Sequence, residues 1–436
     1  MTLRNSLLRL GSANAVMLVS QIVTMLALGV VMRGPDLGLF LLCQSIAQTF
    51  SAVATLRFDS ALPAARSRVE LGALLVCAGA ATLMSSALVF LLALGARGLD
   101  LFELDTVPIA GIVMTALLTL IVAAGQVGRY FQIRFKAIVR IERGTYIRAG
   151  LVAMLRGVLI ALLVSHASGF VYAHQGMLLL TCELLIGAGF ALSVAPRIPG
   201  GWIARRRRFH ALRSAVKRNW KFPTLEAPST LVNSIAVNAP IYLVTHFFGI
   251  AATASFGLAY RAMAVPVGQL ALALTEALQA HYAELLRNRR VDAFAHLFRR
   301  SSLLIGLLGL VGCVAAYFLI EPAVTAVAGE KLREFARICV VIAPWVAMIV
   351  LINTNSRLVP LLHAQELKLV YDFTSISAIA VIFAIQTHYR LDLIEFVQIL
   401  TASQLVTYSI YWLLLNHAVN RTVMRHAGRS PMTVTR

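Results

Sequence analysis

Two arginines lie deep inside apolar segments of this 436-residue chain, where a guanidinium is a candidate ligand for an anion. Arg261 lies about eight residues into one apolar segment, and Arg156 lies about eight residues into another. A guanidinium binds phosphate through two parallel hydrogen bonds, so either residue could hold a phosphorylated group. Glu183 lies inside a third apolar segment, and an ion pair between Arg156 and Glu183 is the structural alternative.

Three carboxylates are candidates for carrying a coupling proton. Glu183 lies inside its apolar segment, whereas Glu226 and Asp372 lie within about a turn of the predicted cytoplasmic end of theirs. Burial favours the neutral form of a carboxylic acid, which is the property that a proton carrier needs. Glu226 and Asp372 could equally be interfacial residues.

Polar side chains also recur along single helix faces inside apolar segments. Water is absent from the hydrocarbon, so such residues face a neighbouring helix or a hydrated path. We interpret the stripes, which come from both halves of the chain, as the lining of a shared polar cavity; Gln44 and Gln48 are substrate-contact candidates within it. The stripes are Asn14 and Gln21; Gln44, Gln48, Ser51 and Thr55; Glu226, Ser229 and Asn233; and Thr401, Gln404, Tyr408 and Tyr411.

Motifs of known enzyme and metal sites are missing from the sequence. There is no GxxxxGK[ST], HExxH or GxSxG, and no pair of the five cysteines has CxxC spacing. We therefore predict a transporter rather than an enzyme, with no catalytic residue, no metal site and no cofactor. Without a nucleotide site, transport would depend on an ion gradient, on the gradient of the substrate or on a partner.

The elements that hold these residues are predicted from composition. With 59% hydrophobic and only 13% charged residues, the chain cannot be a water-soluble globule. Unalternated apolar runs of about twenty residues indicate membrane-spanning helices rather than the strands of a barrel. We predict an all-α integral membrane protein with about twelve transmembrane helices. The spans are residues 12–32, 37–56, 71–94, 107–127, 149–165, 177–195, 224–248, 253–275, 302–320, 338–355, 369–387 and 396–415.

The excess of positive charge, +20 overall, lies mainly in alternate connections between the spans. Six of the 39 Lys and Arg residues fall in the odd connections and 31 in the termini and the even connections. This asymmetry predicts that both termini are cytoplasmic. The most basic connection, 196–222, contains four consecutive arginines at 205–208. Between two spans it is expected to contact anionic membrane lipid, and no nucleic acid is expected as a partner.

The basic connection divides the chain into two halves of six spans. Residues 40–62 and 256–278 are both second spans of a half, and both end near an acidic residue. Because six is even, the halves would have the same orientation, as in parallel repeats of transporters. The predicted domains are a lobe at 1–195, a linker at 196–222, a second lobe at 223–415 and a cytoplasmic tail at 416–436.

A segment of the second half resembles a known family of transporters. Residues 221–287 resemble the Wzx-type polysaccharide flippases of the multidrug/oligosaccharidyl-lipid/polysaccharide exporter superfamily. Residues 38–68 are similar to the corresponding block of the first half, with an acidic residue after the sequence LRF. The motif residues are Phe222 and Pro223; Pro228, Ser229, Leu231 and Asn233; Pro240; FFG at 247–249; and GLAYR at 257–261 with Pro266.

The resemblance implies a twelve-helix, two-lobed, alternating-access transporter of the bacterial inner membrane. Its substrate would be an undecaprenyl-pyrophosphate-linked oligosaccharide, moved from the cytoplasmic to the periplasmic leaflet for O-antigen, capsule or exopolysaccharide assembly. A glycan polymerase and a chain-length regulator would be further partners. The family's recurring YR maps onto Tyr260 and Arg261, and its Asn after PSxL maps onto Asn233. Arg261 would bind the pyrophosphate; the second cationic site at Arg156 follows from this sequence alone.

Two other functions compete with this interpretation. A cation-coupled drug exporter of the same superfamily would favour buried carboxylates over buried arginines, and this chain contains both. A membrane-embedded glycan polymerase or ligase would usually need catalytic residues on a substantial loop, and no predicted outside connection is long enough.

Overall fold

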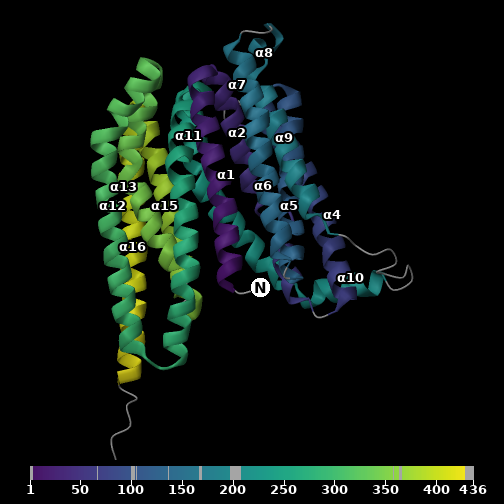
Figure 1. Cartoon of the computed structure of the whole chain (residues 1–436), viewed down its shortest axis with the longest axis vertical. Coiled ribbons are helices and arrows are strands. Elements are labelled where there is room, and N and C mark those ends of the chain that lie inside the picture. Colours follow the sequence, from purple (N-terminus) through teal and green to yellow (C-terminus); the bar gives the residue numbers. More distant parts are fainter. Residues whose placement is uncertain are drawn as a thin grey trace, which may run out of the picture. The chain divides into compact units, whose positions relative to one another are not determined.

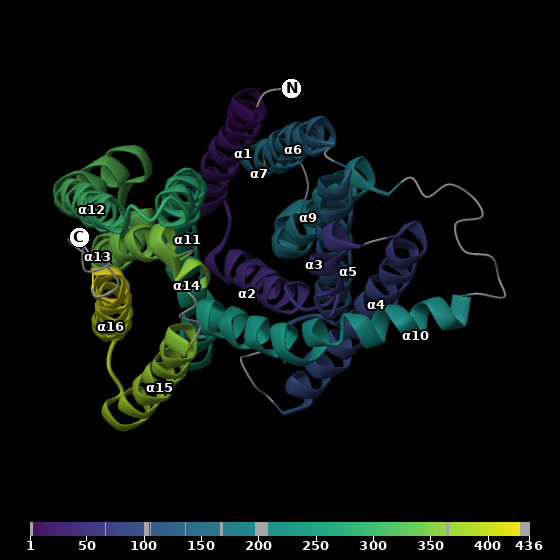
Figure 2. The same cartoon turned by 90° about the horizontal axis from the view of Figure 1, so that it is seen from below.

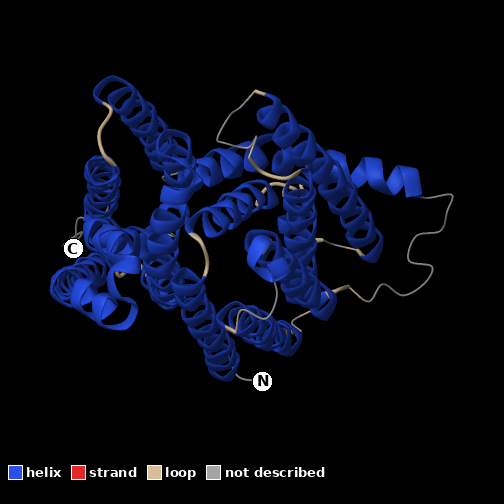
Figure 3. Cartoon of the chain, turned by 90° about the horizontal axis from the view of Figure 1, so that it is seen from above, coloured by secondary structure: helices blue, strands red, loops and turns tan. Residues whose placement is uncertain are grey.

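The protein is an all-helical membrane protein. The computed structural model describes residues 3–427 apart from 66, 100–103, 105, 136, 166–168, 197–207, 357 and 363–365. Every regular element in these residues is a helix (Figure 3). Within them, ten stretches are long and apolar enough to cross a membrane; one of these, Phe222–Gly268, includes parts of two predicted spans. With α2 (Gly34–Ser51), the helices account for all twelve predicted spans, and the predicted fold class is confirmed.

The chain divides into two compact units, Met1–Leu258 and Ala259–Arg436 (Figure 1). The helix α11 (Ala227–Arg287) runs through the division. The predicted boundaries at 195, 222 and 415 separate the two six-span lobes, the basic linker and the tail. They stay predictions. The other elements before α11 are α1 (Leu3–Val31), α3 (Phe58–Ala61), η1 (Leu62–Ala64), α4 (Arg68–Gly98), α5 (Ile109–Arg134), α6 (Ile138–Leu151), η3 (Val152–Arg156), α7 (Gly157–Val164), α8 (Gly169–Ala173), α9 (Gln175–Val194), α10 (Arg208–Arg218) and η5 (Phe222–Glu226). Those after α11 are α12 (Val291–Ala328), η6 (Gly329–Leu332), α13 (Arg333–Ser356), α14 (Leu358–Leu361), α15 (Glu366–Tyr389) and α16 (Leu393–Ala427).

Two glycines shape the N-terminal unit. Gly249 has φ 84° and ψ 174°, a non-helical conformation that breaks α11 between the predicted seventh and eighth spans. A residue with a side chain rarely adopts this conformation, so glycine suits the position. Gly38 of α2 lies against α11, where a Cβ would come within 1.9 Å of the carbonyl oxygen of Ile250. Close backbone approach at a small residue is the usual way in which membrane helices pack.

The helix α10 lies across the end of the N-terminal helices and packs against α4 (Figures 1 and 2). Its Ala215 is buried in an apolar cluster with Phe58 and Phe131, and Arg218 pairs with Glu70 at 3.5 Å. This helix is the end of the predicted basic linker, so part of that linker is a packed element. Residues 205–207 of the arginine run lie outside the described residues.

Two predicted spans have different bounds in the structure. The second was predicted to reach residue 56, but α2 ends at Ser51 and hydrogen-bonded turns follow. The fifth was predicted to begin at residue 149, whereas a continuous helix runs from Ile138, and Val139–Val164 is the stretch that can span. Charged residues at 140–148 lowered the apolar signal there, although one helical face is packed against α1 and α9.

Candidate functional site

The candidate site is a charged centre in the N-terminal unit, formed by α1, α9 and the continuous helix α6–η3–α7. The helix α6 packs on both α1 and α9, so its buried face is enclosed by two neighbours. The segment η3 is a single π-helical turn within this long helix, and it ends at Arg156. Such turns place an extra residue in the helix and are frequent at functional sites.

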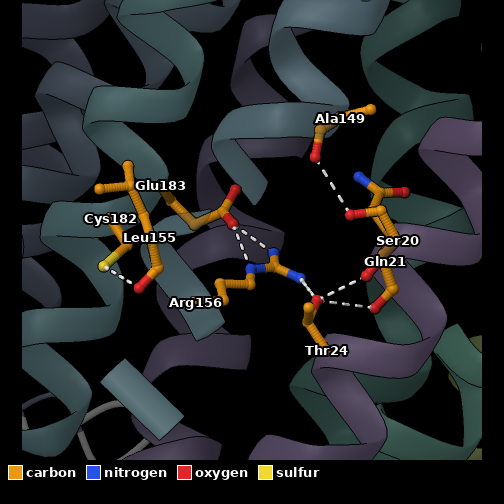
Figure 4. Close-up of polar contacts among 8 residues, drawn as sticks. All are labelled: Ser20, Gln21, Thr24, Ala149, Leu155, Arg156, Cys182 and Glu183. Atoms are coloured by element: carbon orange, nitrogen blue, oxygen red, sulfur yellow. Dashed lines mark hydrogen bonds and ion pairs between the residues drawn. The ribbon is translucent and has the colours of Figure 1, made fainter. Parts of the chain in front are cut away.

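Arg156 and Glu183 form a buried ion pair, with only 2% and 5% of their surfaces exposed. The guanidinium donates from Nε to Oε1 of Glu183 at 3.1 Å and from Nη2 to the same oxygen. Its Nη1 donates to the hydroxyl of Thr24 on α1 at 3.2 Å, so three helices meet at this group (Figure 4). Of the two arrangements that the sequence left open for Arg156 and Glu183, the ion pair is the one present.

Apolar side chains surround the pair. Met17, Ala149, Val152 and Ile186 form a buried cluster at the same helix junction, and Leu155 packs against it. Charges in such surroundings interact more strongly than in water, and an unpaired one would be costly. The pairing of Arg156 with Glu183 therefore stabilises both charges within the membrane-spanning part of the unit.

A second guanidinium, that of Arg148, belongs to the same centre. Arg148 lies over the ring of Phe190 on α9, 5.6 Å from its centroid, and interacts electrostatically with Glu183 and Arg156. Its Nε is buried and meets no hydrogen-bond acceptor among the described residues. Sequence reasoning missed this residue by placing it in a connection. Its spacing of eight residues from Arg156 is the signal that could have found it.

The other predicted carboxylate of the N-terminal unit, Glu226, accepts hydrogen bonds from Arg57. Nε and Nη2 of Arg57 lie 3.0 and 2.7 Å from the same carboxylate oxygen. Arg57 follows Leu56 in a turn where both residues have left-handed backbone conformations, with φ of 60° and 49°. Burial alone would lower the pKa of Arg57, but its bonds to Glu226 and the charge of Asp59 raise the pKa overall. Arg57 is therefore charged at any physiological pH.

Asp59, just after this turn, is a buried carboxylate that the site predictions did not include. It is fully buried, and Thr55 donates to its Oδ1 at 2.6 Å. Its Oδ2 meets no donor among the described residues. The acidic position after LRF was the signal in the sequence.

The predicted polar face of the second span is not continuous. Gln44 is half-buried with a buried Oε1 that meets no donor in the described part of the chain, whereas Gln48 is exposed. Thr55 lies beyond the end of the helix, and its hydroxyl donates a hydrogen bond to Asp59. Asn233 of α11, in the predicted stripe of the seventh span, is exposed. The single-face prediction for 44–55 is thus wrong, because the helix ends at Ser51.

The predicted residues of the C-terminal unit lie on α11 and α15. Tyr260 is half-buried and stacks on Trp345, with ring centroids 5.1 Å apart. Arg261, next to it on α11, is also half-buried. Asp372 is half-buried and interacts electrostatically with Tyr371 and Tyr411. Aromatic rings therefore cluster in this region, since Tyr371 also contacts Tyr408 and Tyr411.

Of the nine predicted site residues, the structure thus pairs Arg156 with Glu183 directly. Gln44, Gln48, Glu226 and Asn233 belong to the same unit as this pair, and Tyr260, Arg261 and Asp372 belong to the other. In the described residues, no group of three His, Cys, Asp or Glu side chains is placed to hold a metal ion.

Solved structures with the same fold cover nearly the whole chain. The inward-facing conformation of a multidrug resistance MATE family transporter of the MOP superfamily matches with a TM-score of 0.59 at 12% identity, covering 99% of this chain and 97% of that one. A MOP superfamily transporter from Pyrococcus furiosus Vc1 (DSM3638) gives 0.57 at 16% identity, over 95% of both chains. An outward-facing MATE transporter gives 0.53 at 15% identity, over 96% of both. No protein-family model and no curated protein matches the sequence.

The chain therefore has the fold of the MATE transporters of the MOP superfamily. At these identities the likeness concerns the fold. The fold that the predicted resemblance implies is therefore the fold observed. The narrower resemblance to Wzx-type flippases depends on the motif residues in 221–287.

Proposed function

We propose that the chain is an alternating-access flippase for a polyprenyl-pyrophosphate-linked oligosaccharide in the bacterial inner membrane. In this proposal Arg261 binds the pyrophosphate, while Gln44, Gln48, Asn233 and Tyr260 contact sugar or line the path. A charged headgroup with sugars is costly to move through hydrocarbon, and arginine and amide side chains offset that cost. The polyprenyl tail stays in lipid.

The observation that carries the proposal is the engagement of Glu183 by Arg156. A transporter of cationic drugs needs a carboxylate that is available in the membrane interior. Glu183 is the one acidic residue of α9, and it already accepts two hydrogen bonds from Arg156. The charged centre of the N-terminal unit thus has a cationic balance once Arg148 is included, which favours an anionic substrate.

The remaining predicted residues take subsidiary roles in the proposal. Arg156 contributes to the second cationic site through the centre that it forms with Glu183. Glu183, Glu226 and Asp372 are the candidates for coupling to an ion gradient. Anionic membrane lipid, a glycan polymerase and a chain-length regulator are the proposed partners.

Export of polymer from cells tests the proposal. A strain that lacks this chain should accumulate lipid-linked repeat units on the cytoplasmic leaflet, and the wild-type gene should restore surface polymer. The Arg261→Ala variant should not restore it at equal protein level, whereas Arg300→Ala, an exposed position of α12, should. Full export by Arg261→Ala would contradict the assigned role, and accumulation of single units on the periplasmic side would indicate a polymerase or ligase.

A cation-coupled drug exporter is the second candidate, because one structure with this fold is that of a multidrug resistance transporter. The other is described as having a binding pocket of reverse polarity that suggests a different function, so the fold accommodates binding pockets of different polarity. Sensitivity to cationic dyes on deletion, with normal surface polymer, would favour the drug exporter.

A further inference from the structure

The charged centre of the N-terminal unit contains more positive than negative charge. Arg156 uses three guanidinium nitrogens on Glu183 and Thr24. Arg148 interacts with the same Glu183 but has no hydrogen bond of its own from Nε to a described residue. One carboxylate cannot satisfy two guanidinium groups, which together offer ten N–H donors.

Arg148 lies on the buried face of its helix rather than on the lipid-facing one. Ile141, Ala149 and Val152 on this face are buried, whereas Ile147 and Met154 on the opposite face are exposed. The partner helix α9 runs antiparallel, so that Phe190 lies opposite Arg148 and Glu183 lies opposite Arg156. Arg148 itself is half-buried, and its guanidinium, with a buried Nε, is held against the ring of Phe190 by stacking.

The π turn aligns the two arginines. In a regular α-helix, eight residues would leave Arg156 about 80° away from Arg148 around the axis. The extra residue of the turn η3 reduces this offset to about 20°, and the two residues then lie about 10 Å apart along the helix axis. The turn therefore places both guanidinium groups on one face.

We propose that Arg148 is an anion-binding residue of the N-terminal unit, and that its ligand is a phosphate or pyrophosphate group. Such a ligand supplies hydrogen-bond acceptors for Nε and for the two terminal nitrogens of the guanidinium. It also balances the positive charge of the two arginines that Glu183 alone does not neutralise. Two sources share this chemistry: the headgroup of an anionic lipid and the pyrophosphate of the carried substrate. The second source rests on the proposed function, whereas the anion site does not.

Titration with inorganic pyrophosphate tests the site. All proteins in these titrations carry Arg261→Ala, so that the pyrophosphate site proposed at Arg261 does not contribute, and wild type here means an unchanged Arg148. The full-length protein in phosphatidylcholine nanodiscs should bind pyrophosphate, and R148Q should weaken the affinity about tenfold or more, because a charge-assisted bidentate contact is lost. R143Q is the matched control, since Arg143 is an exposed residue of the same helix, and its affinity should match the wild type. Equal affinity of R148Q and wild type would overturn the proposal.

Further arms separate folding, ligand source and function. If R148Q fails to fold, R148K keeps the charge but loses the fork, and an unchanged affinity in R148K would overturn the proposal. In phosphatidylglycerol nanodiscs, a weaker apparent pyrophosphate affinity for wild type but not for R148Q would identify a lipid headgroup as the occupant. An affinity equal in both membranes, still lost in R148Q, would assign the site to a substrate phosphate.

The proposed function can fail separately. Pyrophosphate binding that depends on Arg148, in a protein that does not move lipid-linked oligosaccharide, would leave the anion site and contradict the flippase. Wild-type transport by R148Q, together with loss of transport in Arg261→Ala, would exclude Arg148 from the substrate path and leave the flippase.

Discussion

At the scale of single residues, the ion pair of Arg156 and Glu183 decides how the interior of the N-terminal unit is charged. The sequence showed two charged residues inside separate apolar segments but could not show that the segments are neighbours. The contact arises from packing of α6 on α9, and Thr24 of α1 completes it. The pairing of charges depends on which helices are neighbours in the fold. Hydropathy along the chain does not predict which helices are neighbours.

Breaking the pair should destabilise the protein. Arg156→Ala leaves Glu183 buried without its partner, which costs about 3–5 kcal/mol for a buried pair. The melting temperature of the purified protein should fall clearly, while Arg143→Ala, at an exposed position of the same helix, should leave it unchanged. A melting temperature of Arg156→Ala equal to that of wild type would show that the pair does not stabilise the fold.

At the scale of elements, turns and helix ends account for most of what the sequence did not predict. Apolar runs located every span, because the membrane requires about twenty such residues whatever the neighbours are. The π turn at 152–156 and the left-handed turn at Leu56 and Arg57 contain no glycine that would signal them. The sequence did not predict that the fifth span starts as early as Ile138, because the charged residues at the start of α6 lower the apolar signal. Their helix is packed against its neighbours all the same.

Changing the spacing of the two arginines should uncouple the charged centre. Insertion of one alanine after Gly150, an exposed position between Arg148 and Arg156, would rotate Arg156 by about 100° relative to Arg148. We expect loss of polymer export and a lower melting temperature. Ala153→Leu, at an exposed position of η3, keeps the chain length, so it should behave as wild type; normal export by the insertion variant would show that the alignment of the two arginines is dispensable.

The contact of α2 with α11 should tolerate no side chain at its closest point. A Cβ at Gly38 would lie 1.9 Å from the carbonyl oxygen of Ile250, so Gly38→Leu must separate the helices or prevent folding. The yield of correctly folded protein should fall sharply. Gly79→Leu is the control, because no atom lies within 4 Å of a Cβ there; equal yields of the two variants would contradict this packing.

At the scale of the whole molecule, the fold was predictable and the substrate was not. Span number and class follow from composition, and structures with the same fold cover the chain from end to end. The predicted cytoplasmic location of both termini follows from the charge asymmetry and stays a prediction. The predicted site residues lie in two units. The motif in 221–287 indicates which residues could bind a substrate, but it does not indicate which substrate they bind.

Movement of the cargo between leaflets is the central claim. Purified protein should be reconstituted into vesicles that carry a fluorescent undecaprenyl-pyrophosphate oligosaccharide, and a membrane-impermeant quencher should be added outside. With wild-type protein the quenchable fraction should grow with time from that of protein-free vesicles, and with Arg261→Ala it should not. A quenchable fraction that stays at the protein-free value with wild-type protein, in vesicles that do take up a cationic dye, would contradict the account.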